Sequence, residues 1–352
     1  MIKIIMIGPG SDEKGGIATV IKNFKEYYPL SKGQMVYLDS WVAGSKSKRL
    51  IVFLKSLLKL NEWLKKSPEG IVHIHLAQDG SFFRKRLLSK SAIKKGAKVI
   101  LHLHGSQFDK FYNNESRKGQ AKIRDVLVEV SQVVVLSREW ANFIEEIVPI
   151  RVIIMENAVQ LPEKIAYNVN SRKIITLGRI GHRKGSYDIL NVALSLKNSL
   201  PDVVFHLYGD GDHEEIQRQL NALKLTNVSL SEWMKTEDLP RLYEDAAIHL
   251  LPSYHEGMPM AMLETMAYGI PNVISSVGGI PQVIDSGGNG ILIEAGNIQQ
   301  IVKEIEDLML DSAKRSKLSQ EASKIIEKCY SLESYYGKWD QLYKNLIIRK
   351  KK

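Results

Sequence analysis

The chain has 352 residues, a length that suits two α/β domains better than one small core. Hydrophobic residues make up 44% and charged residues 25%, as in a soluble globular protein. No apolar run reaches the roughly 18 to 20 residues of a membrane-spanning helix, and the strand-like start MIKIIMIGPG is too short for a signal peptide. The single cysteine, Cys329, excludes an internal disulfide framework, so we expect a cytoplasmic protein.

The net charge of +10 is concentrated in one part of the chain. Residues 46–95 contain thirteen Lys and Arg against three acidic residues, and this difference of ten positive charges equals the net charge of the whole chain. Residues 349–352 form a second basic cluster. Such asymmetry predicts an acidic partner: a membrane surface, nucleic acid or a phosphorylated acceptor. Nucleic acid is disfavoured because aromatic residues are not interleaved with the basic ones and no known binding module is present.

The first predicted element is a strand over residues 1–9, followed by a glycine-rich loop and a helix over residues 17–28. Strand, glycine loop and helix form the opening unit of a Rossmann-type domain, although the loop lacks the GxGxxG pattern. Gly15 and Gly16 could let the backbone approach a diphosphate closely. A simple turn between strand and helix is the alternative.

Residues 46–66 form an amphipathic pattern, with leucines at helical spacing and lysines between them. It predicts either a helix packed on the core or one that lies on a membrane surface. Predicted strands at residues 70–77 and 97–109 contain two histidine pairs, His73/His75 and His102/His104. Alternate residues of a strand share a face, so each pair could chelate a metal. No carboxylate or cysteine set completes such a site, and a histidine at a strand end is a better candidate for substrate contact.

The polar stretch 160–172 predicts an interdomain linker, and alternating strands and helices after it predict a second parallel sheet. In the loop 177–185, Arg179 and Lys184 follow a strand and precede a helix, an arrangement that suits a diphosphate. Two solvated basic residues are the alternative. The pair Asp210 and Asp212 has the spacing of a metal-binding DxD, but it lies in a glycine turn and is predicted to be structural.

The stretch 253–269 runs from a polar turn, SYHEGMP, into a helix that ends at a glycine. Free amides at such a helix start can bind an anion. Glu256 and Glu264 stand eight residues apart, so both could approach one cleft from the same side. Carboxylates accept hydrogen bonds from sugar hydroxyls, so turn and glutamates together predict a sugar-nucleotide site. A chance occurrence of these features is the alternative, and the last third of the chain reads as helical.

These motifs together resemble a known family. The GG loop, HLHG, LGRI with RKG, YGDG, SYHEGMPMAMLETMAYGIPNVISS and GGIPQVI occur in the order found in the retaining glycosyltransferases of the GT-B fold, family 4 (glycosyltransferase group 1). The resemblance covers nearly the whole chain and is strongest over residues 172–300. It implies an α/β protein with two Rossmann-like, doubly wound parallel-sheet domains facing a cleft.

The resemblance also implies a division of the chain. Residues 1–165 would form the acceptor-side domain that faces the membrane. Residues 166–330 would bind the nucleotide-sugar donor. Residues 331–352 would form a helix that crosses back to the first domain and ends in a basic tail.

Site residues follow from the same resemblance. The residues implied in catalysis are His104, Arg179, Lys184 and Glu256. Those implied in donor binding are Gly15, Gly16, Arg179, Lys184, Met234, Glu256, Gly257, Met258 and Glu264. Arg179 and Lys184 would pair with the diphosphate, Glu256 would bind the sugar hydroxyls and Glu264 the ribose hydroxyls. The base would lie against Met234, and His104 would contact the sugar near the reacting centre.

The implied activity is transfer of a hexosyl unit from a nucleotide diphosphate sugar, with UDP the first choice and GDP the next. The anomeric configuration would be retained through front-face attack, in which the departing diphosphate takes the acceptor proton. No metal cofactor is needed when cations neutralise the diphosphate. A lipid-linked oligosaccharide of a surface polysaccharide, at an anionic membrane surface on the inner face of the cell membrane, is the expected acceptor. A sugar-nucleotide epimerase or hydrolase of the same fold and a non-catalytic partner subunit are the alternatives.

Overall fold

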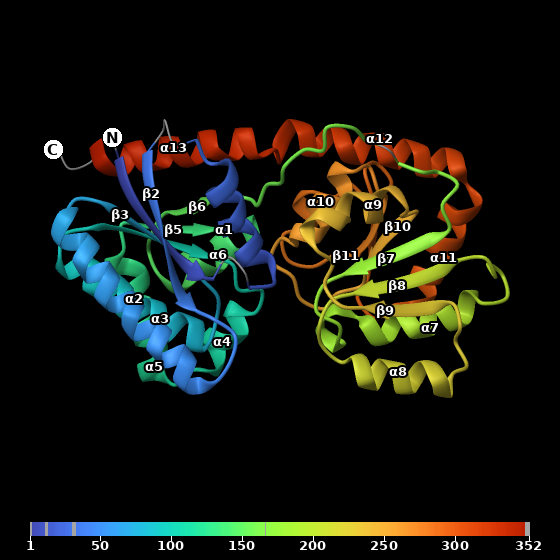
Figure 1. Ribbon diagram of the computed structural model, residues 1–352, viewed down its shortest axis with the longest axis horizontal. Helices are drawn as coiled ribbons and strands as arrows, with labels where there is room; N and C mark the ends of the chain where they lie inside the picture. The colour runs from blue at the N-terminus through green and yellow to red at the C-terminus, as the bar shows by residue number, and fades with distance from the viewer. Residues whose placement is uncertain (1, 11–12, 30–32, 166, 349–352) are drawn as a thin grey trace. The chain divides into compact units, whose positions relative to one another are not determined.

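A computed structural model describes residues 2–10, 13–29, 33–165 and 167–348, so the basic cluster at 349–352 lies outside the described residues. The chain divides into two compact units (Figure 1). Unit 1 contains Met1–Asn157 and Leu332–Lys352, and unit 2 contains Ala158–Ser331. Each unit contains a six-stranded sheet whose strands pair in parallel, with helices on both faces. The architecture is therefore α/β in both units.

The sheet of unit 1 has the strand order β2-β1-β3-β4-β5-β6. Its strands are β1 Ile2–Pro9, β2 Gly33–Trp41, β3 Ile71–Leu76, β4 Lys98–Leu103, β5 Gln132–Val135 and β6 Val152–Ile154. β3 and β5 are buried along their whole length because helices cover both faces. β2, an edge strand on which Gln34, Val36 and Asp39 are exposed, was not predicted from the sequence.

The helices of unit 1 are α1 Gly16–Tyr27, α2 Lys46–Lys66, α3 Gly80–Lys94, α4 Phe108–Asn114, α5 Arg117–Glu129, α6 Arg138–Ile147 and α13 Leu332–Ile348. α2 has the predicted bounds and begins after Ser45, whose side chain accepts a hydrogen bond from the backbone N–H of Lys48 at 3.2 Å. Phe53, Leu60 and Leu64 bury one face of it. Within the described ranges, no helix combines the length and the apolar character that crossing a lipid bilayer requires.

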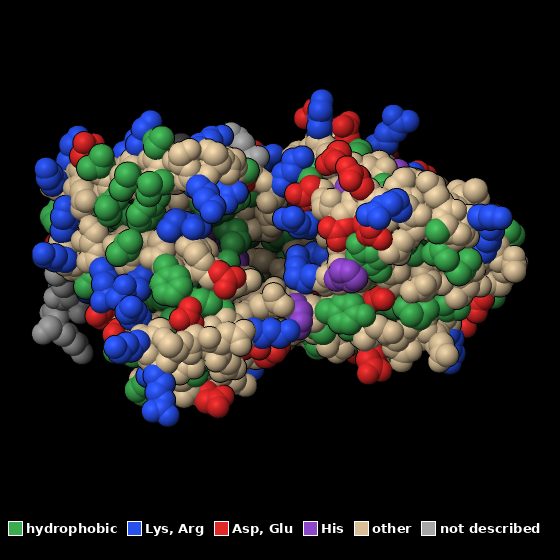
Figure 2. Space-filling model, turned by 90° about the horizontal axis from the view of Figure 1, so that it is seen from below, with side chains coloured by type: hydrophobic (Ala, Val, Ile, Leu, Met, Phe, Trp, Pro, Cys, Tyr) green, Lys and Arg blue, Asp and Glu red, His purple; other side chains and the backbone are tan. Residues whose placement is uncertain are grey.

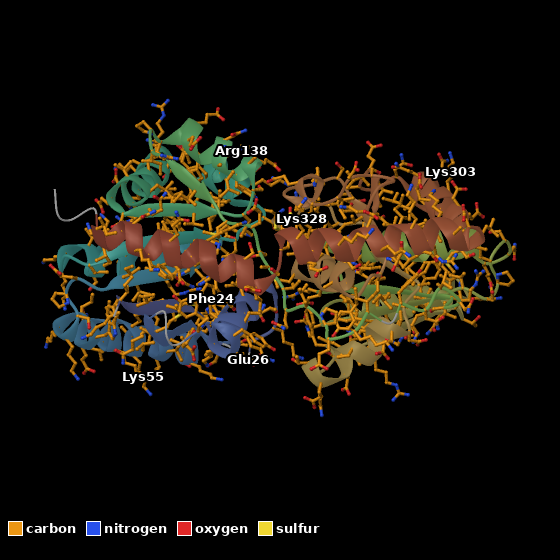
Figure 3. The ribbon with its side chains drawn as sticks, turned by 90° about the horizontal axis from the view of Figure 1, so that it is seen from above. Phe24, Glu26, Lys55, Arg138, Lys303 and Lys328 are labelled. Atoms are coloured by element: carbon orange, nitrogen blue, oxygen red, sulfur yellow. The ribbon has the colours of Figure 1, made fainter. Side chains whose placement is uncertain are left out.

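α13 packs on unit 1 although it is the last helix of the chain. Trp339 is fully buried, and its ring lies 6.0 Å from Phe24 of α1 and 4.4 Å from His73 of β3. The hydroxyl of Tyr28 is 2.5 Å from Asp340, and that of Tyr336 donates to the carbonyl of Asn23 at 2.6 Å. Figure 3, with Phe24 labelled, shows α1 running below α13. An aromatic core therefore joins residues more than three hundred positions apart.

The sheet of unit 2 has the order β12-β11-β10-β7-β8-β9. Its strands are β7 Lys173–Leu177, β8 Val204–Tyr208, β9 Val228–Ser231, β10 Ile248–Leu251, β11 Asn272–Ser275 and β12 Ile291–Ile293. Its helices are α7 Ser186–Leu196, α8 His213–Ala222, α9 Leu239–Glu244, α10 Met260–Ala267, α11 Ile298–Leu310 and α12 Ser312–Cys329, with 3-10 turns at His182–Lys184, Thr236–Asp238 and Ile280–Gln282.

The stretch 160–172 is not the boundary between the units, which corrects the predicted linker. The chain divides after Asn157, and residues 158–331 belong to unit 2. Tyr167 donates its hydroxyl to the carbonyl of Ala247 at 2.9 Å, and Arg315 donates to the carbonyl of Val169 at 2.6 Å. These hydrogen bonds attach the stretch to unit 2, and its polar composition alone did not distinguish it from a solvated linker.

Candidate functional site

Three loops of unit 2 leave the carboxyl ends of neighbouring parallel strands. β11, β10 and β7 are adjacent in the sheet, so the loops that follow them lie at one edge. Ligands of open α/β sheets bind at this edge. Arg179 and Lys184 follow β7, Glu256 follows β10, and the pair Gly278–Gly279 follows β11. The first two loops and Glu256 were predicted to form part of the donor site.

The central contact is an ion pair between two of the predicted residues. Nζ of Lys184 lies 2.6 Å from Oε1 of Glu256, and Nη1 of Arg183 lies 3.6 Å from the same oxygen. The side chains of Lys184 and Glu256 are 11% and 7% exposed. Burial by itself would raise the pKa of Glu256, but Lys184 and Arg183 hold the pKa below its usual range. The carboxylate is therefore ionised at neutral pH, and two cations face it.

Glycines allow this contact. A Cβ on Gly178 would lie 3.0 Å from Cε of Lys184, so the glycine leaves the space in which the lysine turns toward Glu256. Gly185 has φ 68°, and a Cβ there would lie 2.2 Å from the carbonyl oxygen of Pro252. The loops after β7 and β10 are thus in backbone contact, and the N–H of Tyr254 donates to the carbonyl of Arg183 at 2.9 Å.

The predicted residues Gly257 and Met258 lie in the loop after β10, next to the glycine pair that follows β11. The N–H of Gly279 donates to the carbonyl of Gly257 at 2.6 Å, and a Cβ on Gly278 would lie 2.0 Å from the carbonyl oxygen of Glu256. Met258 is buried. The second glycine loop therefore supports the backbone on which Glu256 stands.

A buried polar cluster lies between β10 and α10. His249 of β10 contacts Oδ1 of Asn272 at 2.6 Å and the hydroxyl of Thr265 at 3.1 Å, and all three residues are buried. Thr265 belongs to α10, so these bonds attach the helix to the strands. The pKa of His249 is lowered to about 4, mainly by burial, so the cluster is uncharged. The sequence analysis did not predict it.

Glu264 also lies on α10 but has different contacts from Glu256. The hydroxyl of Tyr243, on α9, donates to Oε2 of Glu264 at 3.3 Å. Burial raises the pKa of Glu264, and the tyrosine hydroxyl lowers it in part. Tyr243 is a site residue that no sequence signal indicated.

The remaining predicted residues of unit 2 are Arg179 and Met234. Arg179 is exposed on the loop after β7 and forms no ion pair with any described residue. Met234 is half-buried against the apolar cluster that contains Leu177, Tyr208 and Tyr243. The neighbouring Trp233 has a buried indole Nε1 that lacks a hydrogen-bond partner in the described part of the chain. Of these residues, Arg179 is exposed and able to meet a ligand.

Asp210 and Asp212 lie in a turn after β8, as predicted. A Cβ on Gly211 would lie 2.1 Å from the carbonyl oxygen of Ile180, and the N–H of Ile180 donates to the carbonyl of Asp210 at 2.7 Å. Oδ2 of Asp212 accepts a hydrogen bond from Tyr187 at 3.0 Å. These contacts attach the turn to the loop after β7.

In unit 1, the three predicted residues follow the carboxyl ends of strands. Gly15 directly precedes α1 with φ 119° and ψ 165°, a conformation that only glycine adopts readily, and Gly16 is the first residue of that helix. His104 follows β4, and its N–H donates to the carbonyl of Leu76 at 2.8 Å. Burial lowers the pKa of His104 to about 3, so the ring is neutral over the physiological range.

Three histidines of unit 1 are close enough to be considered as metal ligands. Ring nitrogens of His73, His75 and His102 lie within 4.8 Å of one another, and all three residues are buried. However, the rings of His73 and His75 stack with centroids 4.5 Å apart and planes 20° apart. Lone pairs of imidazole lie in the ring plane, so those of two stacked rings run nearly parallel and do not meet at one ion. The group is therefore better described as stacked neutral imidazoles.

Comparison with known proteins defines the class. Residues 160–325 match the family model described as "Glycosyl transferases group 1". An "Uncharacterized glycosyltransferase" of Haemophilus influenzae is 28% identical over 180 residues, which cover 51% of each chain. The Escherichia coli "UDP-Gal:alpha-D-GlcNAc-diphosphoundecaprenol alpha-1,3-galactosyltransferase" is 25% identical over 93% of this chain and 89% of its own.

A solved structure, sucrose-phosphate synthase from Thermosynechococcus elongatus, covers 99% of this chain and 100% of its own with a TM-score of 0.83 at 14% identity, a likeness that concerns the fold alone. The protein has the GT-B fold, as the motifs predicted. The segment that matches the family model of the group 1 glycosyltransferases, residues 160–325, lies wholly within unit 2.

Proposed function

We propose that the protein is a retaining hexosyltransferase of glycosyltransferase family 4 that uses a nucleotide diphosphate sugar, a UDP-sugar first, as donor. The observation that carries the proposal is the buried ion pair of Lys184 with Glu256, with Arg183 beside it, at the carboxyl ends of β7 and β10. A group of cations around one ionised carboxylate suits a ligand that has both an anionic diphosphate and neutral hydroxyls. The name of the E. coli relative, which specifies UDP-Gal, supports UDP.

Each predicted residue of unit 2 has a role in donor binding. Lys184 and Arg179 bind the diphosphate, and amides near Gly257 and Met258 contact phosphate or sugar. Glu256 accepts hydrogen bonds from sugar hydroxyls. Glu264 accepts from the ribose, and Met234 lies against the base. From unit 1, Gly15 and Gly16 approach the diphosphate and His104 contacts the sugar.

The chemistry follows from charge. As the bond between the anomeric carbon and the diphosphate oxygen breaks, negative charge grows on the diphosphate and positive charge on the sugar ring. Lys184 and Arg179 stabilise the leaving group, so no metal ion is required. The acceptor hydroxyl attacks from the same face, and its proton passes to the departing phosphate oxygen. Neither Glu256 nor Glu264 acts as the acid or base of a hydrolase.

The acceptor is a glycan, and we propose a lipid-linked oligosaccharide of surface polysaccharide synthesis at the cytoplasmic face of the membrane. α2 and α3 expose apolar side chains among their lysines and arginines; Figure 2 shows such a mixture on unit 1, at the left. The exposed apolar residues of the two helices are Leu50, Ile51, Leu54, Leu58, Phe83 and Leu87. Apolar and basic side chains together favour an anionic lipid surface.

The test is turnover with purified protein. Each of a panel of UDP- and GDP-sugars is incubated with and without a mixture of polyprenyl-diphosphate-linked acceptors, and nucleotide release is measured together with product mass. We expect release that depends on the acceptor, with NMR of the new glycosidic bond showing the anomeric configuration of the donor. Equal release without acceptor would indicate the hydrolase or epimerase alternative. Binding of a donor without turnover under any condition would favour the non-catalytic subunit.

A further inference from the structure

Four histidines of unit 1 form one continuous stack of rings. His73 and His75 alternate along β3, His102 of β4 lies opposite His75, and His104 directly follows β4. Neighbouring centroids are 4.5 Å apart for His73 and His75, 5.0 Å for His75 and His104, and 4.1 Å for His102 and His104. His73, His75 and His102 are fully buried, whereas His104 is half-buried. Only the last histidine of the stack can therefore meet a ligand.

A hydrogen bond joins the accessible histidine to a buried one. Nδ1 of His75 lies 2.9 Å from Nε2 of His104. Burial holds the pKa of each ring below its usual value, and for His75 the neighbouring His73, His104 and Lys85 add to the effect. Both rings are therefore neutral at pH 7, and each carries one proton. Since one ring must donate and the other accept, the position of one proton determines the position of the other.

The other nitrogen of His75 determines which ring donates. Nε2 of His75 is buried and has no hydrogen-bond partner among the residues that the structure describes. A buried N–H without an acceptor is rarer in proteins than a buried lone pair without a donor. The favourable arrangement leaves this Nε2 without a proton. The proton of His75 then lies on Nδ1 and is donated to Nε2 of His104.

His104 must then carry its own proton on Nδ1. No hydrogen bond to this atom is formed by the described residues, so Nδ1–H is free to bind a ligand. Imidazole in water prefers the other tautomer, with its proton on Nε2, so the bond to His75 selects the less common form. In this form the ring offers a ligand a donor and no base.

We propose that His75 is a positioning residue that holds His104 in the Nδ1–H tautomer, so that His104 donates a hydrogen bond to an oxygen atom of the sugar in the active site. The sugar ligand of His104 in this inference rests on the proposed function, whereas the tautomer of His104 does not. A neutral donor keeps the sugar oxygen in place without taking a proton from it. The acceptor proton then goes to the leaving phosphate, as the proposed reaction requires.

Two substitutions at one position test the role of His75. In His75→Asn the amide nitrogen takes approximately the place of Nδ1, so the donor is kept. In His75→Gln it takes approximately the place of Nε2, so the donor to His104 is lost while size and polarity stay similar. His73→Leu is the matched control, because it removes a buried ring of the same stack that bonds Tyr343 and His102 instead of His104.

The first readout is the tautomer itself. Two-bond ¹⁵N–¹H correlation spectra of ¹⁵N-histidine-labelled protein distinguish the two neutral forms, and the signal of His104 is the one lost in His104→Ala. We expect Nδ1–H in the native chain, in His75→Asn and in His73→Leu, and a shift toward Nε2–H in His75→Gln. The Nε2–H form in the native chain, or an unchanged tautomer in His75→Gln, would overturn the inference whatever the protein's activity.

The second readout is the sugar-dependent step. Loss of a supporting hydrogen bond typically reduces the function of the supported histidine about 10- to 100-fold. We expect such a fall in the transfer rate for His75→Gln, near-native rates for His75→Asn and His73→Leu, and an unchanged affinity for UDP, which lacks the transferred sugar that His104 would contact. A rate in His75→Gln equal to that of the control would contradict the role. If the native chain transfers no sugar at all, the proposed function fails, and the spectra still decide the tautomer.

Discussion

Nζ of Lys184 lies 2.6 Å from Oε1 of Glu256, and both side chains are almost withdrawn from water. A diphosphate that binds Lys184 must share this cation with the carboxylate. Arg183, 3.6 Å from the same oxygen, can keep Glu256 ionised while Lys184 turns to the phosphate. If Lys184 binds the diphosphate and Glu256 the sugar hydroxyls, as proposed, this contact couples the recognition of these two parts of the donor.

Separate loss of the two partners should have different effects on nucleotide affinity: only the loss of Lys184 should weaken it. Lys184→Ala removes a charge-assisted hydrogen bond of about 1.5–3 kcal/mol, so we expect the Kd for UDP to rise about 10- to 100-fold. Glu256→Gln removes the competitor for Lys184, so UDP should bind as tightly as before or more tightly, while transfer falls on the order of 10²-fold. Isothermal titration calorimetry measures both affinities.

The control for this prediction is Lys173→Ala. Lys173 also forms an ion pair in unit 2, at 2.5 Å from Asp245, but it stands at the start of β7 instead of its end. Its loss should leave the affinity for UDP unchanged. Native affinity in Lys184→Ala would contradict the assignment of that lysine to the diphosphate.

Glu264 should reduce stability at neutral pH. Its pKa is raised above the ordinary 4.5, so the folded state holds the proton more tightly than the unfolded state. The free energy of unfolding therefore decreases as the pH rises through about 4.5, and the decrease is complete above the raised pKa. We expect Glu264→Gln to increase the Tm by a few degrees at pH 7.5, since about 1 kcal/mol shifts a domain of this size by 2–4 °C.

The gain in Glu264→Gln should disappear near pH 4, where the native side chain is protonated as well. Differential scanning calorimetry at the two pH values measures it. Glu244→Gln, on the exposed face of the adjacent α9, should change the Tm at neither pH. Weaker UDP binding in the stabilised Glu264→Gln variant would indicate that the carboxylate is retained for the ligand.

Lys85 should cause a second pH dependence of stability, opposite in direction to that of Glu264. This lysine of α3 is 3% exposed, its nearest polar contact is Oγ of Ser81 at 3.4 Å, and burial lowers its pKa from 10.5 to about 7. The unfolded state binds the proton more tightly, so the contribution of Lys85 to stability should increase as the pH rises from about 7 to 10. Lys85→Met should raise the Tm at pH 7 and remove this dependence.

Calorimetry between pH 7 and 10 measures the slope for the native chain and the variant. Lys94→Met, at the exposed end of the same helix, removes a lysine without removing a buried charge and should keep the native slope. A slope that survives in Lys85→Met would show that another group causes it.

The outer face of α2 should determine binding to lipid vesicles. Replacing Leu50, Leu54 and Leu58 by serine removes exposed apolar side chains without touching the buried face of Phe53, Leu60 and Leu64. We expect flotation with phosphatidylglycerol vesicles to be lost, and binding of the native chain to weaken at high salt, because the lysines act through screened charges. Leu310→Ser, at an exposed leucine of unit 2, is the control. Native flotation by the triple variant would contradict the proposal.

The sequence predicted elements whose pattern is local. The amphipathic helix at 46–66 and the buried strand β3 are examples, because a helical repeat or an apolar run is visible within a few residues. The edge strand β2 was missed because exposed polar residues such as Gln34 and Asp39 interrupt it and no apolar run marks it. The stretch 160–172 was misread because its hydrogen bonds to Ala247 and Arg315 of unit 2 join residues far apart in the chain, which its polar composition does not reveal.

The site was predicted residue by residue but not as a set of contacts. Lys184 and Glu256 were predicted to have separate roles, because their positions in the sequence do not show that β7 and β10 are neighbouring strands. Arg183 was overlooked although it directly precedes Lys184, and Tyr243 lies in a segment without any signal. His75 was considered only as half of a chelating pair. Its bond to His104 depends on the register of β3 and β4, which the sequence does not reveal.

The position of α13 has a consequence for biosynthesis. Unit 1 begins with the first residues of the chain, but the helix that covers Phe24 and His73 is translated last, after the whole of unit 2. At 5–20 residues per second, synthesis of residues 158–331 takes roughly 10–30 s. During that time the ribosome holds a nascent first unit whose aromatic surface is uncovered, while the second unit has every segment it needs to fold. We therefore expect unit 2 to reach its native state first on the ribosome, and the chain to depend on chaperones until Trp339 emerges.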